Sequence, residues 1–386
     1  MKWEKVKLGD IATCIQPGPF GSQLHNSDYS KEGTPIIMPK DIVGGAIVHS
    51  GLLKVSEEHV KRLSRHQVYE GNLMVARKGD VRKCAYITAN ENGWMTGSDC
   101  LKVVLDESKC YPKFIYYQLR SEHIGRWLEK VSIGATMPSL NTGLLSGIEM
   151  VLPPIEIQKQ IAGILSVYDD LIENNQKQIK LLEEAAQRLY KEWFVDLRFP
   201  GHENTKIVDG VPEGWIKEEI GKIIKKVHRT KQIVASEYKD EGSIPIVDQS
   251  RAFVAGYTND LEARVDFGIP IIVFGDHTRI VKLIQFPFAK GADGTQLIIS
   301  DCLEMPQRLL YCSIMNVDLS NYHYARHFKY LKEEKIMIPT VKVANEFENN
   351  VTGIFSKIQN CRNEIIRCQK TRDLLLPKLM SGEVEV

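Results

Sequence analysis

An internal repeat constrains the fold of this chain more than any other feature of its sequence. Residues 3–9, which read WEKVKLG, return as residues 215–221, which read WIKEEIG. Farther along, residues 150–153 precede a long helical pattern, and residues 336–339 precede a second one. A repeat at this scale indicates repeated structure. The sequence therefore predicts two globular segments that each lead into a long helix and make the same kind of contact at two places.

Both helical patterns carry apolar residues in alternating steps of four and three, which is typical of a coiled-coil seam. In the first helix the seam positions are Ile161, Leu165, Tyr168, Ile172, Asn175, Ile179, Leu182, Ala186, Leu189 and Trp193. In the second helix they are Phe347, Val351, Ile354, Ile358, Cys361, Ile365, Cys368, Arg372, Leu375 and Leu379. Arg372 is the one charged position. A pseudo-two-fold relation between the copies makes the helices antiparallel, with paired positions that add up to about 540.

The heptads alone would also fit two helices of an ordinary all-α domain. That interpretation does not explain the non-helical sequence before each helix, which also repeats. Short apolar runs bounded by Gly, Asn and Asp predict strands there, among them 73–76, 101–105 and 270–274, whereas 112–119 reads as a helix. The predicted fold class is α+β: two mixed α/β domains separated by a pair of long antiparallel coiled-coil helices.

The predicted boundaries follow the repeat and the helix-breaking residues. They are 1–152 for the first domain, 153–198 for the central helix, 199–340 for the second domain and 341–380 for the C-terminal helix. A breaker cluster at 199–201 ends the first helix. Pro377, Ser381 and Gly382 are predicted to end the second.

Composition limits the classes of function. With 386 residues, 43% hydrophobic and 26% charged, the chain can build two or three folded domains. Its net charge of +1 argues against a protein that binds nucleic acid by itself. It does not argue against one whose partner subunits supply the positive charge. No apolar run is long enough to span a membrane, so we expect a cytoplasmic protein without membrane contact. The eight cysteines contain no Cys-x-x-Cys pair, so we expect them reduced and without metal.

No signature of an active site is found. The sequence contains no Gly-x-Gly-x-x-Gly, no P-loop, no His-Glu-x-x-His and no Asn-Pro-Pro-Tyr or Asp-Pro-Pro-Tyr. Residues 107–109 have the Glu-x-Lys spacing of some nucleases, which three residues often match by chance. We predict no catalytic residue and no metal ligand.

Polar loops on a rigid scaffold are the better candidates for recognition. In the first segment, 16–23 is glycine-rich with amide side chains of the kind that read adenine, and 77–83 is a basic turn. In the second, 276–279 occupies the equivalent turn, with 249–251 and 324–327 as further candidates. A basic turn is also what an ordinary solvated loop contains. The candidate DNA-binding residues are Gln23, Arg77, Lys78, Arg82, Lys83, Gln249, Arg251, His277, Arg279 and Arg326.

Together these features resemble the DNA-specificity subunit of Type I restriction-modification systems, over nearly the whole chain. The resemblance is most specific at 152–162 (LPPIEIQKQIA), 169–174 (DDLIEN) and 374–383 (LLLPKLMSGE), and 18–22 (GPFGS) is also similar. The chain departs from the family pattern at Ile157, where glutamate is common, and at 340–343 in the second copy.

The resemblance implies two target recognition domains, each of which reads one half of a bipartite site in double-stranded DNA. It implies that the helices are a spacer and a docking surface for two methylation subunits, which would hold S-adenosylmethionine. Restriction and translocase subunits would join through the complex and use ATP and Mg²⁺. The chain itself would hold no cofactor and would not be an enzyme.

Two other classes of protein stay open at this point. One is a coiled-coil scaffold that never touches DNA, which a gel-shift with the methylation partner present would reveal. The other is a fused methyltransferase or nuclease with a cryptic active site, which methyl transfer by the isolated chain would reveal.

Overall fold

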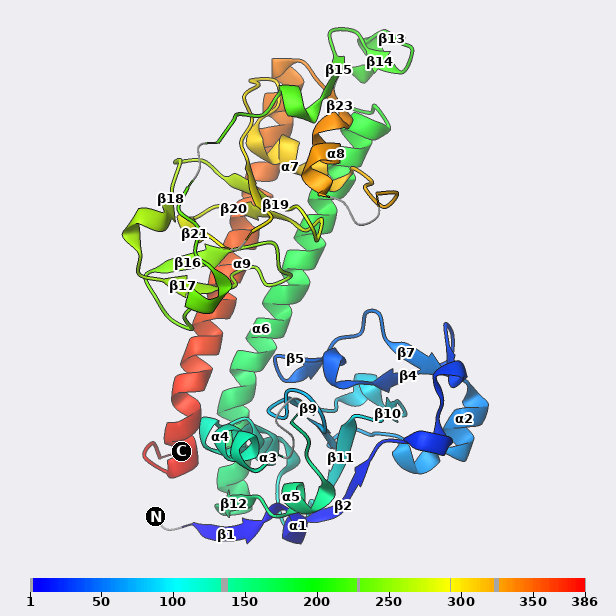
Figure 1. The fold of residues 1–386 in the computed structure, drawn as a ribbon, viewed down its shortest axis with the longest axis vertical. Coiled ribbons are helices and arrows are strands. Elements are labelled where there is room, and N and C mark those ends of the chain that lie inside the picture. Colours follow the sequence, from blue (N-terminus) through cyan, green and yellow to red (C-terminus); the bar gives the residue numbers. More distant parts are fainter. Residues whose placement is uncertain (1–2, 133–137, 228–229, 292, 323–325, 386) are drawn as a thin grey trace. The chain divides into compact units, whose positions relative to one another are not determined.

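The computed structural model describes residues 3–132, 138–227, 230–291, 293–322 and 326–385. The chain divides into two compact units (Figure 1): unit 1 consists of residues 1–172 and 366–386, and unit 2 of residues 173–365. The two long helices, α6 (Ile155–Tyr190) and α9 (Val341–Ser381), each contribute residues to both units. Unit 1 is therefore assembled from both ends of the sequence, whereas unit 2 is one continuous stretch.

The segments that repeat in the sequence pair with each other inside each unit. In unit 1, β1 (Glu4–Lys7) runs antiparallel to β12 (Glu149–Leu152), just before α6 begins. In unit 2, β15 (Ile216–Glu219) runs antiparallel to β23 (Lys335–Ile338), just before α9 begins. In each unit, a strand near the start of the globular segment pairs with the strand at its end, and the long helix begins directly after that pair. The repeat in the sequence is therefore also a repeat in the structure.

Unit 1 contains two four-stranded sheets, with strand orders β10-β4-β7-β3 and β2-β11-β8-β9. Their strands are β2 (Ala12–Pro17), β3 (Tyr29–Ser30), β4 (Thr34–Ile37), β7 (Leu53–Val55), β8 (Leu73–Ala76), β9 (Cys84–Tyr86), β10 (Met95–Thr96) and β11 (Cys100–Leu105), beside a hairpin of β5 (Ile42–Val43) and β6 (Ala46–Ile47). The short helices are α1 (Leu8–Ile11), α2 (Glu57–Arg62), α3 (Pro112–Leu119), α4 (Glu122–Val131) and α5 (Thr142–Ser146). Every residue of β8 is buried, because the sheet is covered on both faces.

Unit 2 repeats this plan with sheets β17-β16-β21-β18 and β20-β19-β22. Its strands are β16 (Ile244–Val247), β17 (Gly256–Thr258), β18 (Arg264–Val265), β19 (Ile271–Gly275), β20 (Val281–Ile284), β21 (Phe288–Lys290) and β22 (Thr295–Ile298), with a hairpin of β13 (Ile207–Val208) and β14 (Val211–Pro212). Its short helices are α7 (Gln307–Met315) and α8 (His327–Glu333). The antiparallel set β9-β8-β11 of unit 1 has the same arrangement as β20-β19-β22.

The long helices pack antiparallel, as the sequence predicts. In unit 1 the early α6 residue Leu165 shares a hydrophobic core with the late α9 residue Leu379. In unit 2 the late α6 residue Tyr190 shares a core with Phe347, near the start of α9. Side chains that hydrogen-bond across the pair, Asp169 with Arg372 and Gln178 with Cys361, have numbers that add up to about 540. All twenty predicted seam positions are buried or half-buried.

The ends of the helices differ from the expectation in two details. After Tyr190 the chain makes a π-helical turn at Lys191–Val195, which lets the adjacent Trp193 and Phe194 both face the core of unit 2. At the other end, the prediction that Pro377 helps to end α9 is wrong, because the helix continues to Ser381. A proline there removes a single hydrogen bond, and the burial of Leu379 in unit 1 outweighs that loss. Gly382, with φ of +71°, ends the helix.

Candidate nucleic-acid interface

The glycine-rich loop and the basic turn of unit 1, two separate predictions, lie together in the structure. The guanidinium carbon of Arg77 lies 5.3 Å from the centre of the Phe20 ring, a side chain that is 53% exposed. Gly18 donates its N–H to the Cys100 carbonyl at 3.1 Å, and a Cβ there would lie 2.0 Å from the Gly97 carbonyl oxygen. Only glycine fits this approach, which holds residues 16–23 against the start of β11.

The basic side chains of this turn divide into two groups. Arg82 forms ion pairs with Glu122 and Glu129 of α4, and its hydrogen bond with Glu122 raises the pKa of Arg82. Lys83 donates to the Pro39 carbonyl at 3.1 Å. These two side chains therefore anchor the turn to the rest of unit 1 in this structure, and their contact with DNA stays a prediction.

The other three predicted residues of unit 1 are Arg77, Lys78 and Gln23. Lys78 is exposed, with its ammonium 3.2 Å from the Asp99 carboxylate. Gln23 is half-buried at the end of the short 3-10 turn Gly21–Gln23. Among the predicted residues of unit 1, Lys78 is the exposed one, and Arg77 is half-buried but makes no ion pair with the described residues.

In unit 2, Gln249 joins the turns that follow β16 and β19. Its side-chain carbonyl accepts a hydrogen bond from the His277 N–H at 3.1 Å, and its side-chain NH₂ donates to the Asp293 carbonyl at 2.8 Å. The Thr278 hydroxyl donates to the Gln249 backbone carbonyl at 2.7 Å. The oxygen and the nitrogen of the Gln249 side-chain amide thus both hold the turns in place. A contact between Gln249 and a base edge stays a prediction.

The other predicted residues of unit 2 surround these turns. Arg251, His277, Arg279 and Arg326 are all exposed. Arg279 has φ of +61° and donates to the Leu319 carbonyl at 3.0 Å. Arg326 directly precedes α8, and the neighbouring candidate Tyr324 lies outside the described residues. The turns therefore present three arginines and one histidine to solvent.

Two buried lysines support the loops, and neither was predicted from the sequence. Lys282 on β20 is 5% exposed and donates to the Asp248 carbonyl at 2.8 Å and to the Ala252 carbonyl. Burial lowers its pKa to about 8, against the attraction of Asp248. In unit 1, Lys102 on β11 donates to the Arg65 and Gln67 carbonyls at 2.6 and 2.8 Å. The available signal was a lysine inside an apolar strand, where an unpaired charge is costly.

Metal binding and membrane spanning find no support among the described residues. In the ranges that it describes, no group of three or more His, Cys, Asp or Glu side chains could hold a metal ion. Over the same ranges, no helix has the length and apolarity needed to cross a membrane.

Comparison with known proteins places these features in a family. The model of the Type I restriction modification DNA specificity domain matches residues 1–184. The chain is 26% identical over 414 residues to the Type I restriction enzyme MjaIX specificity subunit of Methanocaldococcus jannaschii. This match covers 100% of this chain and 94% of the relative. It is 31% identical over 97 residues to the EcoR124I/EcoR124II specificity subunit of Escherichia coli, over 25% of this chain and 24% of the relative.

The fold is shared with a solved structure. The crystal structure of the S subunit of a Type I restriction-modification system from M. genitalium matches 98% of this chain and 96% of its own length, with a TM-score of 0.57 at 16% identity. This likeness shows the fold, which has two β-rich domains and two long helices that pack together. The chain belongs to the family of DNA specificity subunits of Type I restriction-modification systems, which are non-catalytic within their complexes.

Proposed function

We propose that the chain reads a bipartite site in double-stranded DNA, one half through the domain of unit 1 and the other through the domain of unit 2. The observation that carries this proposal is the structural repeat, in which β1–β12 and β15–β23 close two equivalent domains. The candidate turns also correspond: Arg77 donates its N–H to the Asp99 carbonyl at 2.7 Å, and Asp276 donates its N–H to the Gly294 carbonyl at 2.7 Å. Residues 1–152 and 199–340 are the proposed target recognition domains.

We further propose that residues 153–198 and 341–380 act as spacer and as docking surface for two methylation subunits. Apolar side chains that cluster on an exposed helix face support this role, because such clusters mark interaction sites. Ile164, Val167 and Leu171 are exposed and lie at i, i+3 and i+7 on α6 within unit 1. On α6, Val167 in unit 1 is 55% exposed and Leu181 in unit 2 is 64% exposed. The methylation subunits would carry S-adenosylmethionine, and restriction subunits with ATP and Mg²⁺ would join through them.

The test is methylation mapping in cells that carry the chain and its methylation partner. We expect Arg77→Ala to relax the sequence requirement in one half-site and Arg251→Ala to relax it in the other. Loss of one base contact costs about 1–3 kcal/mol of discrimination. Lys130→Ala and Lys206→Ala, at exposed lysines away from the turns, serve as matched controls in the two domains.

Two results would contradict the proposal. If Arg77→Ala and Arg251→Ala relaxed the same half-site, the two domains would not be separate readers. If the purified chain transferred methyl groups to DNA without a partner, it would be an enzyme and not a specificity subunit.

A further inference from the structure

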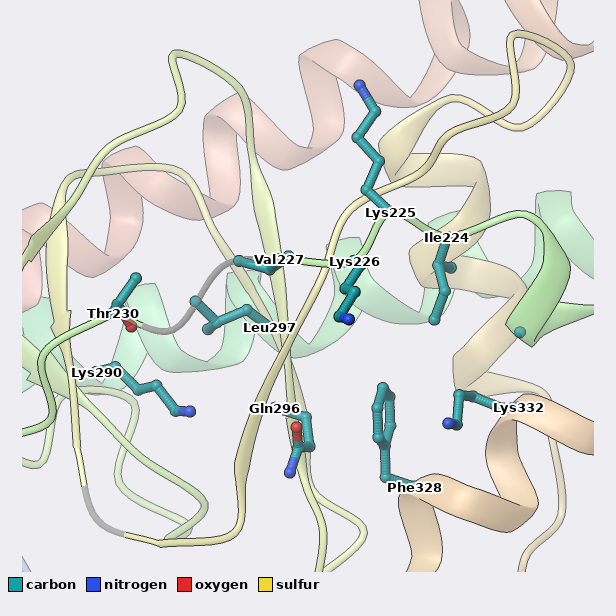
Figure 2. A pocket seen from close by; sticks show the side chains of 11 residues that line it. Ile224, Lys225, Lys226, Val227, Thr230, Lys290, Gln296, Leu297, Phe328 and Lys332 are labelled. Atoms are coloured by element: carbon teal, nitrogen blue, oxygen red, sulfur yellow. The ribbon is translucent and has the colours of Figure 1, made fainter.

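Unit 2 contains a basic cavity of about 590 Å³ that no sequence motif indicated (Figure 2). Its wall is formed by residues 224–227, by β22, by the end of β21 and by α8. Four lysines contribute to the lining, and none of the described lining residues is acidic; the lysines are Lys225, Lys226, Lys290 and Lys332.

Three of the lysines converge on one space. Figure 2 shows Lys226, Lys290 and Lys332 directed toward the region beside Gln296 and Phe328, whereas Lys225 points away. Lys225 is neutralised by Asp301, with 3.6 Å between the charged atoms. For the other three, no carboxylate of the described residues lies within ion-pair distance. Three ammonium groups that face one space repel each other unless an anion lies between them.

The surroundings of these lysines also favour a bound anion. Lys290 is half-buried, and burial lowers its pKa while nearby Asp293 opposes the shift only in part. The Lys332 ammonium lies 5.3 Å from the centre of the Phe328 ring, where a cation–π contact orients it without neutralising its charge. An anion in the cavity would compensate both lysines.

The cavity adjoins the candidate reading turn of unit 2. Phe328 in its wall donates its N–H to the Asp276 carboxylate at 2.8 Å, and Asp276 begins the turn that contains His277. Gln296, also in the wall, lies on β22 directly after Gly294 and Thr295, and the Gly294 carbonyl accepts the Asp276 N–H. The same two elements therefore form the cavity wall and hold the turn. A ligand that contacts both the cavity lysines and the exposed arginines beside the turn would be an extended polyanion.

We propose that this cavity binds the sugar–phosphate backbone of double-stranded DNA beside the second half-site. The inference rests on the proposed function, in which the domain of unit 2 reads DNA. Lys226, Lys290 and Lys332 would contact phosphates, and the side-chain amide of Gln296 would donate a hydrogen bond. Contacts of this kind position a protein on the duplex, and base-edge contacts from the turn supply the sequence preference.

The test uses the full chain assembled with its methylation subunit. Fluorescence anisotropy measures its Kd, as a function of salt, for a duplex with the mapped target and for an unrelated duplex. We expect Lys226→Gln/Lys290→Gln/Lys332→Gln to weaken both duplexes about tenfold or more at low salt and to lower the salt slope by about two to three. The control Lys206→Gln/Lys217→Gln/Lys335→Gln removes the same charge at exposed positions outside the cavity and is expected to leave the slope nearly unchanged.

Each outcome separates the inference from the function on which it rests. A wild-type assembly with no preference for the target duplex would contradict the proposed function. A wild-type assembly with that preference, and a cavity variant whose salt slope equals that of the wild type or of the control, would overturn the inference alone. Lys226→Gln/Lys332→Gln, at two exposed positions, tests the same point without disturbing the half-buried Lys290.

A small-anion site is the remaining alternative. Calorimetric titration with inorganic phosphate distinguishes it. Phosphate binding that the triple variant loses, together with an unchanged salt slope for duplex DNA, would overturn the assignment to the DNA backbone.

Discussion

At the scale of single residues, Lys282 is the side chain on which the second candidate interface most depends. It holds the Asp248 and Ala252 carbonyls at the two ends of the turn that contains Gln249 and Arg251. We expect Lys282→Met to leave the buried Asp248 carbonyl and the partly buried Ala252 carbonyl without this donor and to lower the free energy of unfolding by about 1–3 kcal/mol. Urea unfolding measures the loss, with Lys335→Met at an exposed position as control. DNA methylation mapping should show relaxation of the second half-site alone.

The same lysine predicts a pH dependence with a definite sign. Burial lowers the pKa of Lys282 from 10.5 to about 8, so the unfolded chain holds this proton more tightly than the folded chain. The contribution of Lys282 to stability therefore rises as pH increases from about 8 to about 10.5, and it is lost as pH falls through 8. The stability of the wild type relative to Lys282→Met should increase over this range. A difference that stays constant with pH would show that the lysine is not protonated differently in the two states.

At the scale of elements, Arg372 explains why one charged residue interrupts the predicted seam. Arg372 is buried and donates to the Asp169 carboxylate at 2.6 Å, and the Tyr117 hydroxyl donates to the same carboxylate at 2.6 Å. One acceptor thus joins α6, α9 and α3 within unit 1. The hydroxyl of Tyr117 stays protonated, because burial and the adjacent carboxylate both raise its pKa.

A double-mutant cycle measures this connection. Asp169→Leu and Arg372→Leu should each lower the free energy of unfolding by about 1–3 kcal/mol, because each removes the ion pair between the two helices. After either change the remaining group keeps one partner, Asp373 for Arg372 and the Tyr117 hydroxyl for Asp169. The double variant should lose clearly less than the two single losses combined. Additive losses would mean that the ion pair contributes nothing beyond packing.

Patterns that are local in the sequence predicted much of the fold. The apolar run at 73–76 is β8, the run at 270–274 overlaps β19 (Ile271–Gly275), and 112–119 is α3, because strand and helix periods are visible within a few residues. The heptads predicted an antiparallel pair because the seam is set by spacing alone.

The candidate sites were less predictable, for a physical reason. Gln249 meets His277 and Asp293, and Lys282 meets Asp248, through contacts between residues far apart in the chain. The three lysines of the basic cavity come from three separate segments. No short stretch of the sequence contains such a set of residues. The net charge of the chain is close to zero, and it gives no sign that folding brings these lysines together in one cavity.

At the scale of the whole molecule, the proposed spacer can be tested by a paired insertion. One heptad inserted into α6 after Leu182, with another in α9 after Ile358, keeps the seam in phase and lengthens both helices by about 10 Å. We expect methylation mapping to show the same two half-sites with about three more base pairs between them. As control, the same seven residues go between residues 203 and 204, in the exposed 3-10 turn His202–Asn204. Unchanged spacing with full activity would mean that the helices do not set the distance.

The division of the chain also affects the order in which it can fold during synthesis. Unit 2 is continuous, but the core of unit 1 includes Leu376 and Leu379 near the end of α9. The globular part of unit 1 is therefore synthesised before the α9 residues that complete its core, although domains generally fold in the order of their synthesis. A chain cut before residue 366 would lack Leu376 and Leu379 and would leave this part of the unit 1 core open to water.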